Sequence, residues 1–183
     1  MRKSIIIFFT TFILLSGLLS CKKLVKALFP GMDVNSPEVQ ITVPPIVIVS
    51  ATEQSFGSYT YHFNLDSTIR ANTNNGFNVN DVGSIKVKQI SINITNADQL
   101  NNLANFESAR VTLQSNTNTT PVEIISQTLP DTYASTFTAT PANGPELLSY
   151  SKGSDITYTI YGKMRRVTNK SLNVVVSVIL RLN

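Results

Sequence analysis

Few residues of this chain could carry out chemistry, and the only cysteine among its 183 residues, Cys21, lies in the segment "LLSGLLSCKK". A cysteine can act as a nucleophile, form half of a disulfide, bind a metal or be modified by another enzyme. A nucleophile needs a base, but the chain has one histidine, His62, and no G-x-S-x-G motif. No His, Cys and acidic residues are clustered as in a zinc site. The sequence therefore predicts a protein that is not an enzyme, with no catalytic residues, no metal site and no cofactor.

The surroundings of His62 predict a structural position for it. In "YTYHFNL" hydrophobic and polar residues alternate, which is typical of a half-buried strand, and His62 is on the polar side. We therefore expect His62 to be an exposed strand residue. A less favoured alternative, a carboxylate-based hydrolase, would use acids such as Asp66 and Asp81, which the sequence alone does not bring together.

The segment that precedes Cys21 has the features of an export signal. Arg2 and Lys3 come before "IIIFFTTFILLSGLL", an uncharged run of 15 residues from Ile5 to Leu19. The hydrophobic core of a signal peptide needs about 7 to 15 residues, whereas a membrane span needs about 20. The run therefore favours a secretory signal, and an uncleaved signal anchor is the alternative.

The end of this run resembles the lipobox of bacterial lipoproteins. In that motif an aliphatic residue, a small or aliphatic residue and a small residue precede an invariant cysteine, and here Leu18, Leu19 and Ser20 precede Cys21. The resemblance covers about the first 21 residues. It implies that the thiol of Cys21 receives a diacylglyceryl group and that the preceding peptide is removed.

If Cys21 is acylated, its acyl chains anchor the protein in a lipid bilayer. With two or three acyl chains, release of the protein from the bilayer is negligible. A lysine at position 22 implies, by the sorting rule of enteric bacteria, an outer-membrane location, and we expect the domain to face the periplasm. No cysteine follows Cys21, which suits an oxidising compartment. Lys22, Lys23 and Lys26 could contact anionic headgroups or simply be solvated.

The charge of the chain argues against a nucleic-acid partner. The formal net charge is +4, but five of the 15 Lys and Arg residues and none of the 11 acids lie in the first 26 positions. From Ala27 onward there are 10 basic and 11 acidic residues. The folded part is therefore nearly neutral, and we expect no nucleic-acid binding.

The composition predicts an all-β domain after a short linker. We expect a signal peptide at 1–20, an acylated N-terminus and linker at 21–37, and a single domain at 38–183, because "FPGMDVNSP" contains two prolines and a glycine. Besides "YTYHFNL", seven segments have strand-like patterns: 39–50, 84–95, 108–114, 122–127, 132–138, 155–164 and 172–182. About eight short strands favour an antiparallel immunoglobulin-like β-sandwich, and a closed barrel is the alternative.

Three details of these strands lead to specific expectations. Within 84–95 the apolar residues are at odd positions as far as Val87 and at even positions from Ile90 onward. We therefore expect a β-bulge near Lys88 or Gln89, or a strand that crosses between sheets. In "LNVVVSVILRL" every second residue from Leu172 to Leu182 is apolar, which predicts one fully buried face. The prolines at 44 and 45 predict that 39–50 is an edge strand or two short pieces.

Helices are expected to be short. "ADQLNNLANF" and "GPELLSYSKG" each favour one or two helical turns. The segment from Ser67 to Asp81 is predicted to be a long polar turn in which Asn75 and Gly76 adopt positive φ, and a contact loop is a second possibility. A calcium loop is not expected there, because Ala71 and Val82 would fall at ligand positions.

The aromatic residues predict packing rather than a sugar-binding platform. There is no Trp, and Tyr59, Tyr61 and Phe63 share the face that should form the core. The segment from Glu146 to Arg166 resembles, without a specific motif, the small immunoglobulin-like domains of late-embryogenesis-abundant type. We therefore expect a non-catalytic binding or scaffold module that contacts an envelope protein or a small ligand. The alternative is an adhesin-like structural subunit that assembles by strand addition, with the last strand as donor.

Overall fold

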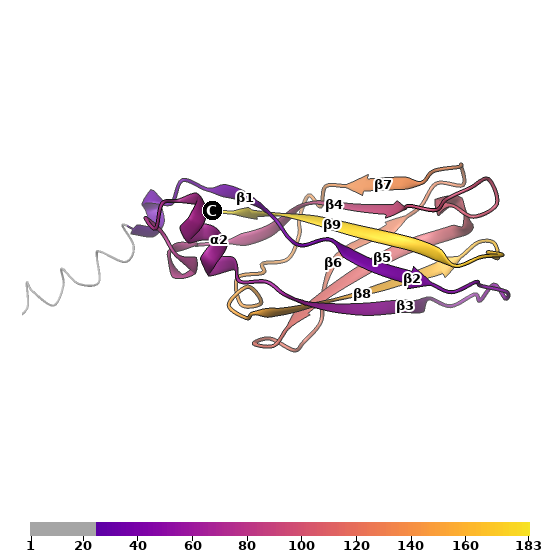
Figure 1. The fold of residues 1–183 in the computed structure, drawn as a ribbon, viewed down its shortest axis with the longest axis horizontal. Helices are drawn as coiled ribbons and strands as arrows, with labels where there is room; N and C mark the ends of the chain where they lie inside the picture. The colour runs from indigo at the N-terminus through magenta and orange to yellow at the C-terminus, as the bar shows by residue number, and fades with distance from the viewer. Residues whose placement is uncertain (1–24) are drawn as a thin grey trace, which may run out of the picture.

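The computed structural model describes residues 25–183, which form two antiparallel β-sheets packed face to face (Figure 1). This confirms the predicted all-β class and antiparallel sandwich. The strands of this part of the chain are β1 (Met32–Asn35), β2 (Val39–Val43), β3 (Gln54–His62), β4 (Ile85–Ile94), β5 (Phe106–Ser115), β6 (Val122–Thr128), β7 (Thr136–Ala139), β8 (Asp155–Met164) and β9 (Leu172–Leu182). Between them lie α2 (Leu65–Asn72) and the 3-10 helices η1 (Val79–Asp81) and η2 (Leu103–Asn105).

The order of the strands is that of a jelly roll. Sheet A has the order β2-β9-β4-β7, with β1 beside the second half of β9, and sheet B has the order β3-β8-β5-β6. From β2 onward, consecutive strands lie in opposite sheets except for β5 and β6. Such alternation is typical of the double Greek key of jelly-roll sandwiches.

Strand β9 is the centre of sheet A. It pairs with β1 and β2 on one side and with β4 on the other. Its predicted inward face is confirmed, because every second side chain from Leu172 to Leu182 is buried. Since both of its edges are occupied, β9 is not free to act as the donor in strand addition.

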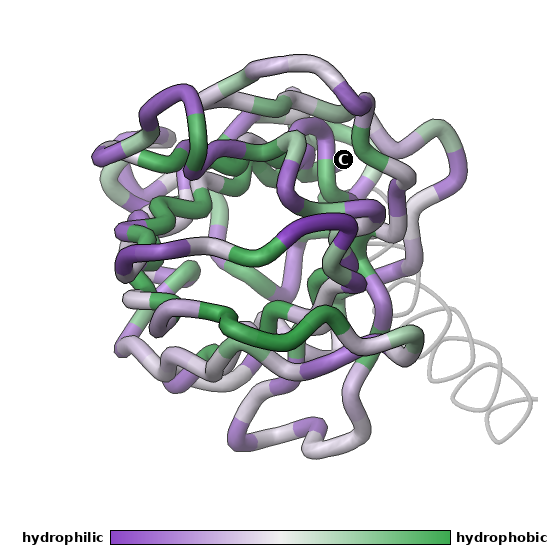
Figure 2. Tube along the Cα trace, turned by 90° about the vertical axis from the view of Figure 1, so that its right-hand side faces the viewer, coloured by the Kyte–Doolittle hydropathy of each residue, from purple (hydrophilic) through white to green (hydrophobic). Residues whose placement is uncertain are grey.

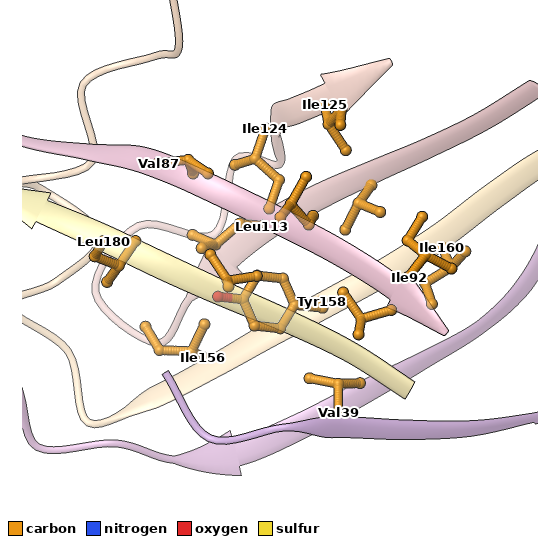
Figure 3. Packing of buried hydrophobic residues seen from close by; sticks show 14 of the residues in the cluster. Val39, Val87, Ile92, Leu113, Ile124, Ile125, Ile156, Tyr158, Ile160 and Leu180 are labelled. Carbon is orange, nitrogen blue, oxygen red and sulfur yellow. The ribbon is translucent and has the colours of Figure 1, made fainter. Parts of the chain in front are cut away.

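The parity change in β4 corresponds to a β-bulge. The register of β4 against β9 shifts between Val87 and Gln89, which confirms the predicted bulge. Ile85 and Val87 before the bulge, and Ile90 and Ile92 after it, are therefore all buried. The core between the sheets consists mainly of such branched aliphatic side chains around Tyr158, which is 1% exposed (Figure 3).

One segment near the N-terminal part of the domain differs from its predicted structure, and another agrees with it. The stretch expected to be a linker contains β1, in which Met32 pairs with Leu182 and Asn35 with Ile179. The segment 39–50 provides an edge strand of sheet A, which was one of the two predicted alternatives, and this strand ends at Val43 because the two prolines that follow cannot continue the pairing.

The helical predictions are confirmed only in part. Residues 67–81 are not one long turn: α2 occupies its first part and η1 its end. Positive φ occurs at Asn75, as expected, but its companion is Asn74 (φ 50) and not Gly76. "ADQLNNLANF" forms the short helix η2, as predicted, whereas "GPELLSYSKG" forms hydrogen-bonded turns without a helix.

The connections between the strands gather at the two ends of the sandwich (Figure 1). We call one end the tip; it consists of residues 44–53, 95–105, 129–135 and 165–171. The other end, the base, contains residues 63–84, 116–121 and 140–154 together with the start of the described chain and Asn183.

Candidate functional site

The predicted lipid-attachment residue, Cys21, and the lipobox residues Leu18, Leu19 and Ser20 lie outside the described residues. The described chain begins at Val25, four positions after Cys21, and enters the fold at the base. Within residues 25–183 no helix is both long and apolar enough to cross a membrane. In the same range, no three His, Cys or acidic residues are grouped so that they could hold a metal ion.

His62 lies where the strand pattern predicted. Its side chain is 71% exposed, and Nδ1 is 3.1 Å from Asp155 Oδ1 on the neighbouring strand β8. The pair belongs to a row of cross-strand polar contacts on the outer face of sheet B, which includes hydroxyl contacts of Ser58 with Thr159 and of Thr60 with Thr157. His62 therefore contributes to an exposed sheet surface and does not face a cavity.

Asp66 and Asp81 are both close to η1, but each is held by local contacts. Asp66 Oδ2 accepts a hydrogen bond from Arg70 (2.7 Å), and Oδ1 accepts one from the N–H of Val79 (2.9 Å). These two contacts, Arg70 first, hold the pKa of Asp66 below its ordinary value. Asp81 caps η1 by accepting from the N–H of Asn78 at 2.9 Å. Because Asp66 is stabilised as an anion, it is poorly suited to act as a general acid.

The tip carries most of the exposed large hydrophobic side chains of the described chain. Of the eight such residues, only Leu28 and Tyr59 lie elsewhere. The six at the tip come from all four loops: Val47 (77% exposed), Ile48 (75%), Val49, Leu100 (70%), Tyr133 and Val167. Figure 2 views the molecule from this end. Exposed hydrophobic side chains that gather at one end of a domain are typical of an interaction surface.

An apolar groove lies beside the most exposed of these loops. It has a volume of about 560 Å³ and is open to solvent. One wall is formed by residues 44–48, with two prolines and three aliphatic side chains, and the other by residues 54–57 at the start of β3. Phe56 is the aromatic residue of this lining, so the groove offers mainly hydrophobic contacts.

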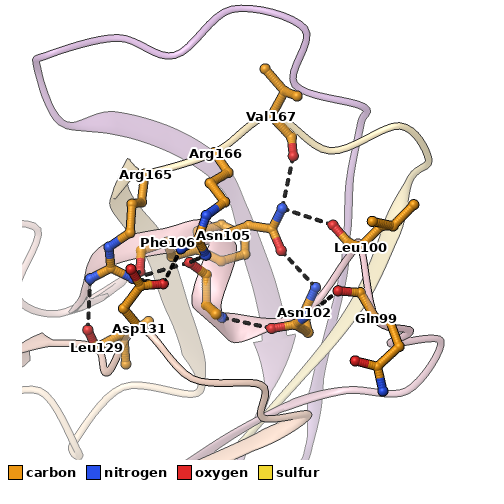
Figure 4. Close-up of polar contacts among 11 residues, drawn as sticks. Gln99, Leu100, Asn102, Asn105, Phe106, Leu129, Asp131, Arg165, Arg166 and Val167 are labelled. Atoms are coloured by element: carbon orange, nitrogen blue, oxygen red, sulfur yellow. Dashed lines mark hydrogen bonds and ion pairs between the residues drawn. The ribbon is translucent and has the colours of Figure 1, made fainter.

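A buried network of asparagines holds the tip loops together (Figure 4). Asn102 and Asn105 are each 3% exposed. Asn105 Oδ1 accepts from the N–H of Asn102 (2.9 Å), and its Nδ2 donates to the carbonyls of Leu100 (3.0 Å) and Val167 (2.8 Å). These bonds join residues 95–105 to residues 165–171. Because the amide groups are buried and hydrogen-bonded, they rigidify the loops that they connect.

Two arginines extend the network to the third loop. Arg165 donates to the carbonyls of Ala104 (3.0 Å), Phe106 (2.8 Å) and Leu129 (2.9 Å). Arg166 forms an ion pair with Asp131. The fourth loop is joined by Ile46, whose N–H donates to the hydroxyl of Thr168 at 2.9 Å.

The charges of the tip are compensated within it or by the adjoining strand. Asp98 is paired with Lys170 (2.6 Å), and Asp131 with Arg166. Glu53 accepts three hydrogen bonds from Arg110 of β5, whose guanidinium also lies 4.0 Å from the ring centroid of Tyr161. The tip therefore offers an apolar surface on which the charges are balanced, and its partner need not be charged.

This site could not be predicted from the sequence. Residues 46–49, "IVIV", have the pattern of a strand and were predicted as one, but they follow two prolines and lie exposed in a loop. The other tip residues are single hydrophobic side chains in polar loops, so only the topology shows that they lie together. The arrangement supports binding of an apolar partner surface; none of the groups described above makes it a catalytic centre.

No protein-family model and no curated protein sequence matches the chain. Solved structures with a similar fold include the family 32 carbohydrate-binding module of C. perfringens NanJ in complex with galactose, at 10% identity and a TM-score of 0.37, covering 81% of this chain and 99% of that one. Drosophila NLP-core matches at 13% identity and a TM-score of 0.30, covering 78% and 96% of the two chains. The capsid protein of BFDV matches at 7% identity and a TM-score of 0.32, covering 84% and 98%. At these TM-scores and identities the likeness carries no conclusion about function.

Proposed function

We propose that this protein is a lipid-anchored envelope lipoprotein that acts as a non-catalytic binding module and contacts its partner through the tip. The observation that carries the binding role is the gathering of six exposed hydrophobic side chains from four loops on a hydrogen-bonded frame. Rigid presentation of apolar side chains lowers the entropy lost on binding. The partner that fits is an envelope protein with an apolar, uncharged contact surface.

The anchor rests on the lipobox-like sequence before Cys21. Because the described chain enters the fold at the base, an anchor at Cys21 would place the tip at the far end of the molecule from its attachment (Figure 1). A binding surface in that position is accessible to proteins of the periplasm. The proposed location remains the outer membrane, with the domain facing the periplasm.

The anchor is tested by labelling cells with a clickable fatty acid. Label should be incorporated into the wild-type chain and absent from Cys21→Ala. Protease treatment of intact cells then distinguishes the two sides of the outer membrane, since a domain facing the periplasm is protected. Equal labelling of both chains would contradict the proposal.

The binding role is tested by photo-crosslinking in cells. A photoreactive amino acid at Ile48 should yield an adduct of defined mass, and the same group at Lys86, exposed on β4 away from the tip, should not. Introducing Val47→Asp into the Ile48 probe should abolish the adduct, because a buried charge without a partner is unfavourable at an apolar contact. Adducts that are identical at both positions, or unaffected by Val47→Asp, would contradict a binding role for the tip.

Assembly by strand addition has less support. The donor that the sequence suggested, β9, is paired along both edges. Any such assembly would have to use an edge strand such as β3 or β6, each of which pairs on one side only in sheet B.

A further inference from the structure

A second cavity lies at the base and is unlike the groove at the tip. It has a volume of about 570 Å³ and is open to solvent. Three segments that are far apart in the sequence line it: residues 25–26, residues 78–82 around η1, and Leu148 with Lys152. It therefore includes the end of the stretch 67–81 that the sequence suggested as a contact loop.

The two lysines of this cavity carry charges that the described chain does not neutralise. Lys26 and Lys152 are exposed, and neither forms an ion pair with a carboxylate of residues 25–183. No compensating acid can come from residues 1–24, which contain none. The one acid in the lining, Asp81, accepts hydrogen bonds from the N–H (2.9 Å) and Nδ2 (2.5 Å) of Asn78. Asn78 is neutral and leaves the charge of Asp81 in place, so the lining carries two positive charges and one negative charge.

The rest of the lining is largely aliphatic. Val25, Val79 and Leu148 lie in the lining together with Val82, which has no solvent-exposed surface. Cationic groups beside an aliphatic wall suit a ligand that has an anionic head joined to an apolar body. Asn78 and Asn80 add amide groups that can donate to phosphate or glycerol oxygens.

The position of the cavity along the chain identifies the ligand further. Val25 is four residues after Cys21, and four extended residues span at most about 14 Å. With Cys21 acylated, as proposed above, the cavity would therefore lie within the headgroup region of the membrane or directly beside it.

We propose that this cavity binds the phosphate-containing headgroup of an acidic phospholipid, with Lys26 and Lys152 as the binding cations. The inference rests on the proposed lipid anchor for the source of the ligand. Binding at the base fixes the orientation of the domain on its membrane, so that the tip is directed away from the bilayer.

The test uses the chain from Lys22 onward, which lacks the anchor but contains every strand of both sheets and the whole described core. Co-sedimentation is measured with phosphatidylcholine vesicles and with vesicles that also contain phosphatidylglycerol. We expect binding to the second kind only. Lys26→Gln and Lys152→Gln should each weaken it about fivefold, since a lysine near an anionic surface contributes about that factor. The double variant should lose about 25-fold if the two effects are independent.

The matched control is Lys86→Gln, which removes the same charge at the base end of β4 but outside the cavity lining. This variant should bind as the wild type does. An equal loss of vesicle binding in Lys86→Gln would show that binding depends on general surface charge, and it would overturn the proposed site. A melting-temperature shift with inorganic phosphate alone, together with no binding to the anionic vesicles, would show a free-phosphate site and overturn the lipid source.

Failure of this proposal can be distinguished from failure of the proposed function. If the anionic vesicles do not bind the chain from Lys22 onward, the headgroup site is wrong, but fatty-acid labelling of Cys21 and crosslinking at the tip are unaffected. The lysine variants should melt at the wild-type temperature, because neither side chain forms a described ion pair.

Discussion

Ile46 and Thr168 exchange two hydrogen bonds across 122 positions of sequence. The N–H of Ile46 donates to the hydroxyl of Thr168 (2.9 Å), and the N–H of Thr168 donates to the carbonyl of Ile46 (3.0 Å). Thr168 is only 2% exposed. This pair fixes the loop that carries the most exposed hydrophobic residues to the loop between β8 and β9.

Thr168→Val should therefore destabilise the protein by about 1–3 kcal/mol, because the N–H of Ile46 would lose its acceptor in a partly buried position. Thr168→Ser retains the hydroxyl and should lose about 0.8 kcal/mol with the methyl group. Chemical denaturation measures both values, and amide exchange at Ile46 should become faster only in the valine variant. Equal stability of the two variants would contradict the role of this bond.

Gly162→Ala should be destabilising by about 1–3 kcal/mol because it overpacks the sheet. A Cβ at this position would lie 2.6 Å from Cε2 of Phe56 and 2.7 Å from the carbonyl oxygen of Ser108. The ring of Phe56 can move, but the carbonyl belongs to the paired strand β5. Gly144→Ala is the control, because its nearest neighbour would be 3.7 Å away. Thermal unfolding compares the two, and similar midpoints would count against the crowding at Gly162.

Tyr61→Phe should stabilise the protein by about 1 kcal/mol. The hydroxyl of Tyr61 is buried and has no hydrogen-bond partner in the described chain. Tyr150→Phe should have the opposite sign, since the hydroxyl of Tyr150 donates to the carbonyl of Thr120 at 3.0 Å. Denaturant midpoints give both signs in one experiment. A loss of stability in Tyr61→Phe would mean that its hydroxyl has a partner.

Stability should also fall at alkaline pH because of Tyr61 and Tyr158. Burial raises the pKa of both phenols above the ordinary value of 10, and for Tyr61 the neighbouring Tyr158 adds to the effect. Above pH 10 the unfolded state therefore releases protons that the folded state retains, so the free energy of unfolding falls as pH rises. The absorbance of tyrosinate should show these two groups ionising only as the protein unfolds. Their ionisation in the folded protein would contradict this prediction.

Asp98 should contribute to stability at neutral pH but not in strong acid. Lys170 first, and then Asn101, lower the pKa of its carboxyl from 3.8 to about 2. Its contribution is complete above about pH 4 and is lost as the pH falls through about 2, because the unfolded state binds the proton more readily. Asp98→Asn should flatten this part of the stability curve, measured by urea denaturation at several pH values. If the stability of Asp98→Asn fell at low pH as steeply as that of the wild type, the pH dependence would not come from Asp98.

The strands could be predicted because each has its own local pattern. β8 was predicted with its observed limits, and β9 with its buried face, since alternation requires no knowledge of neighbouring strands. The bulge at Val87–Gln89 could be predicted for the same reason. The jelly-roll order could not, because β2, β4 and β9 meet over long sequence separations that leave no mark in any one segment.

Strand β1 and helix α2 were not predicted, because other features of the sequence favoured a linker and a turn at these positions. β1 is four residues long and is flanked by glycine and proline, so its turn residues suggested a linker. Helix α2 has a capping residue, Asn64, whose side chain accepts from the N–H of Ser67, and it buries Leu65 and Ile69 at a spacing of four. These features were present, but the neighbouring strand pattern included Leu65 and the many asparagines favoured a turn.

The central place of β9 has a consequence for the order in which the molecule can assemble. β9 follows every other strand along the chain, yet β1, β2 and β4 reach each other only through it. Sheet A therefore cannot close until residues 172–182 have been synthesised and are free to insert. A nascent chain that has not yet reached this point therefore stays incompletely folded, however many of its other strands have already been made.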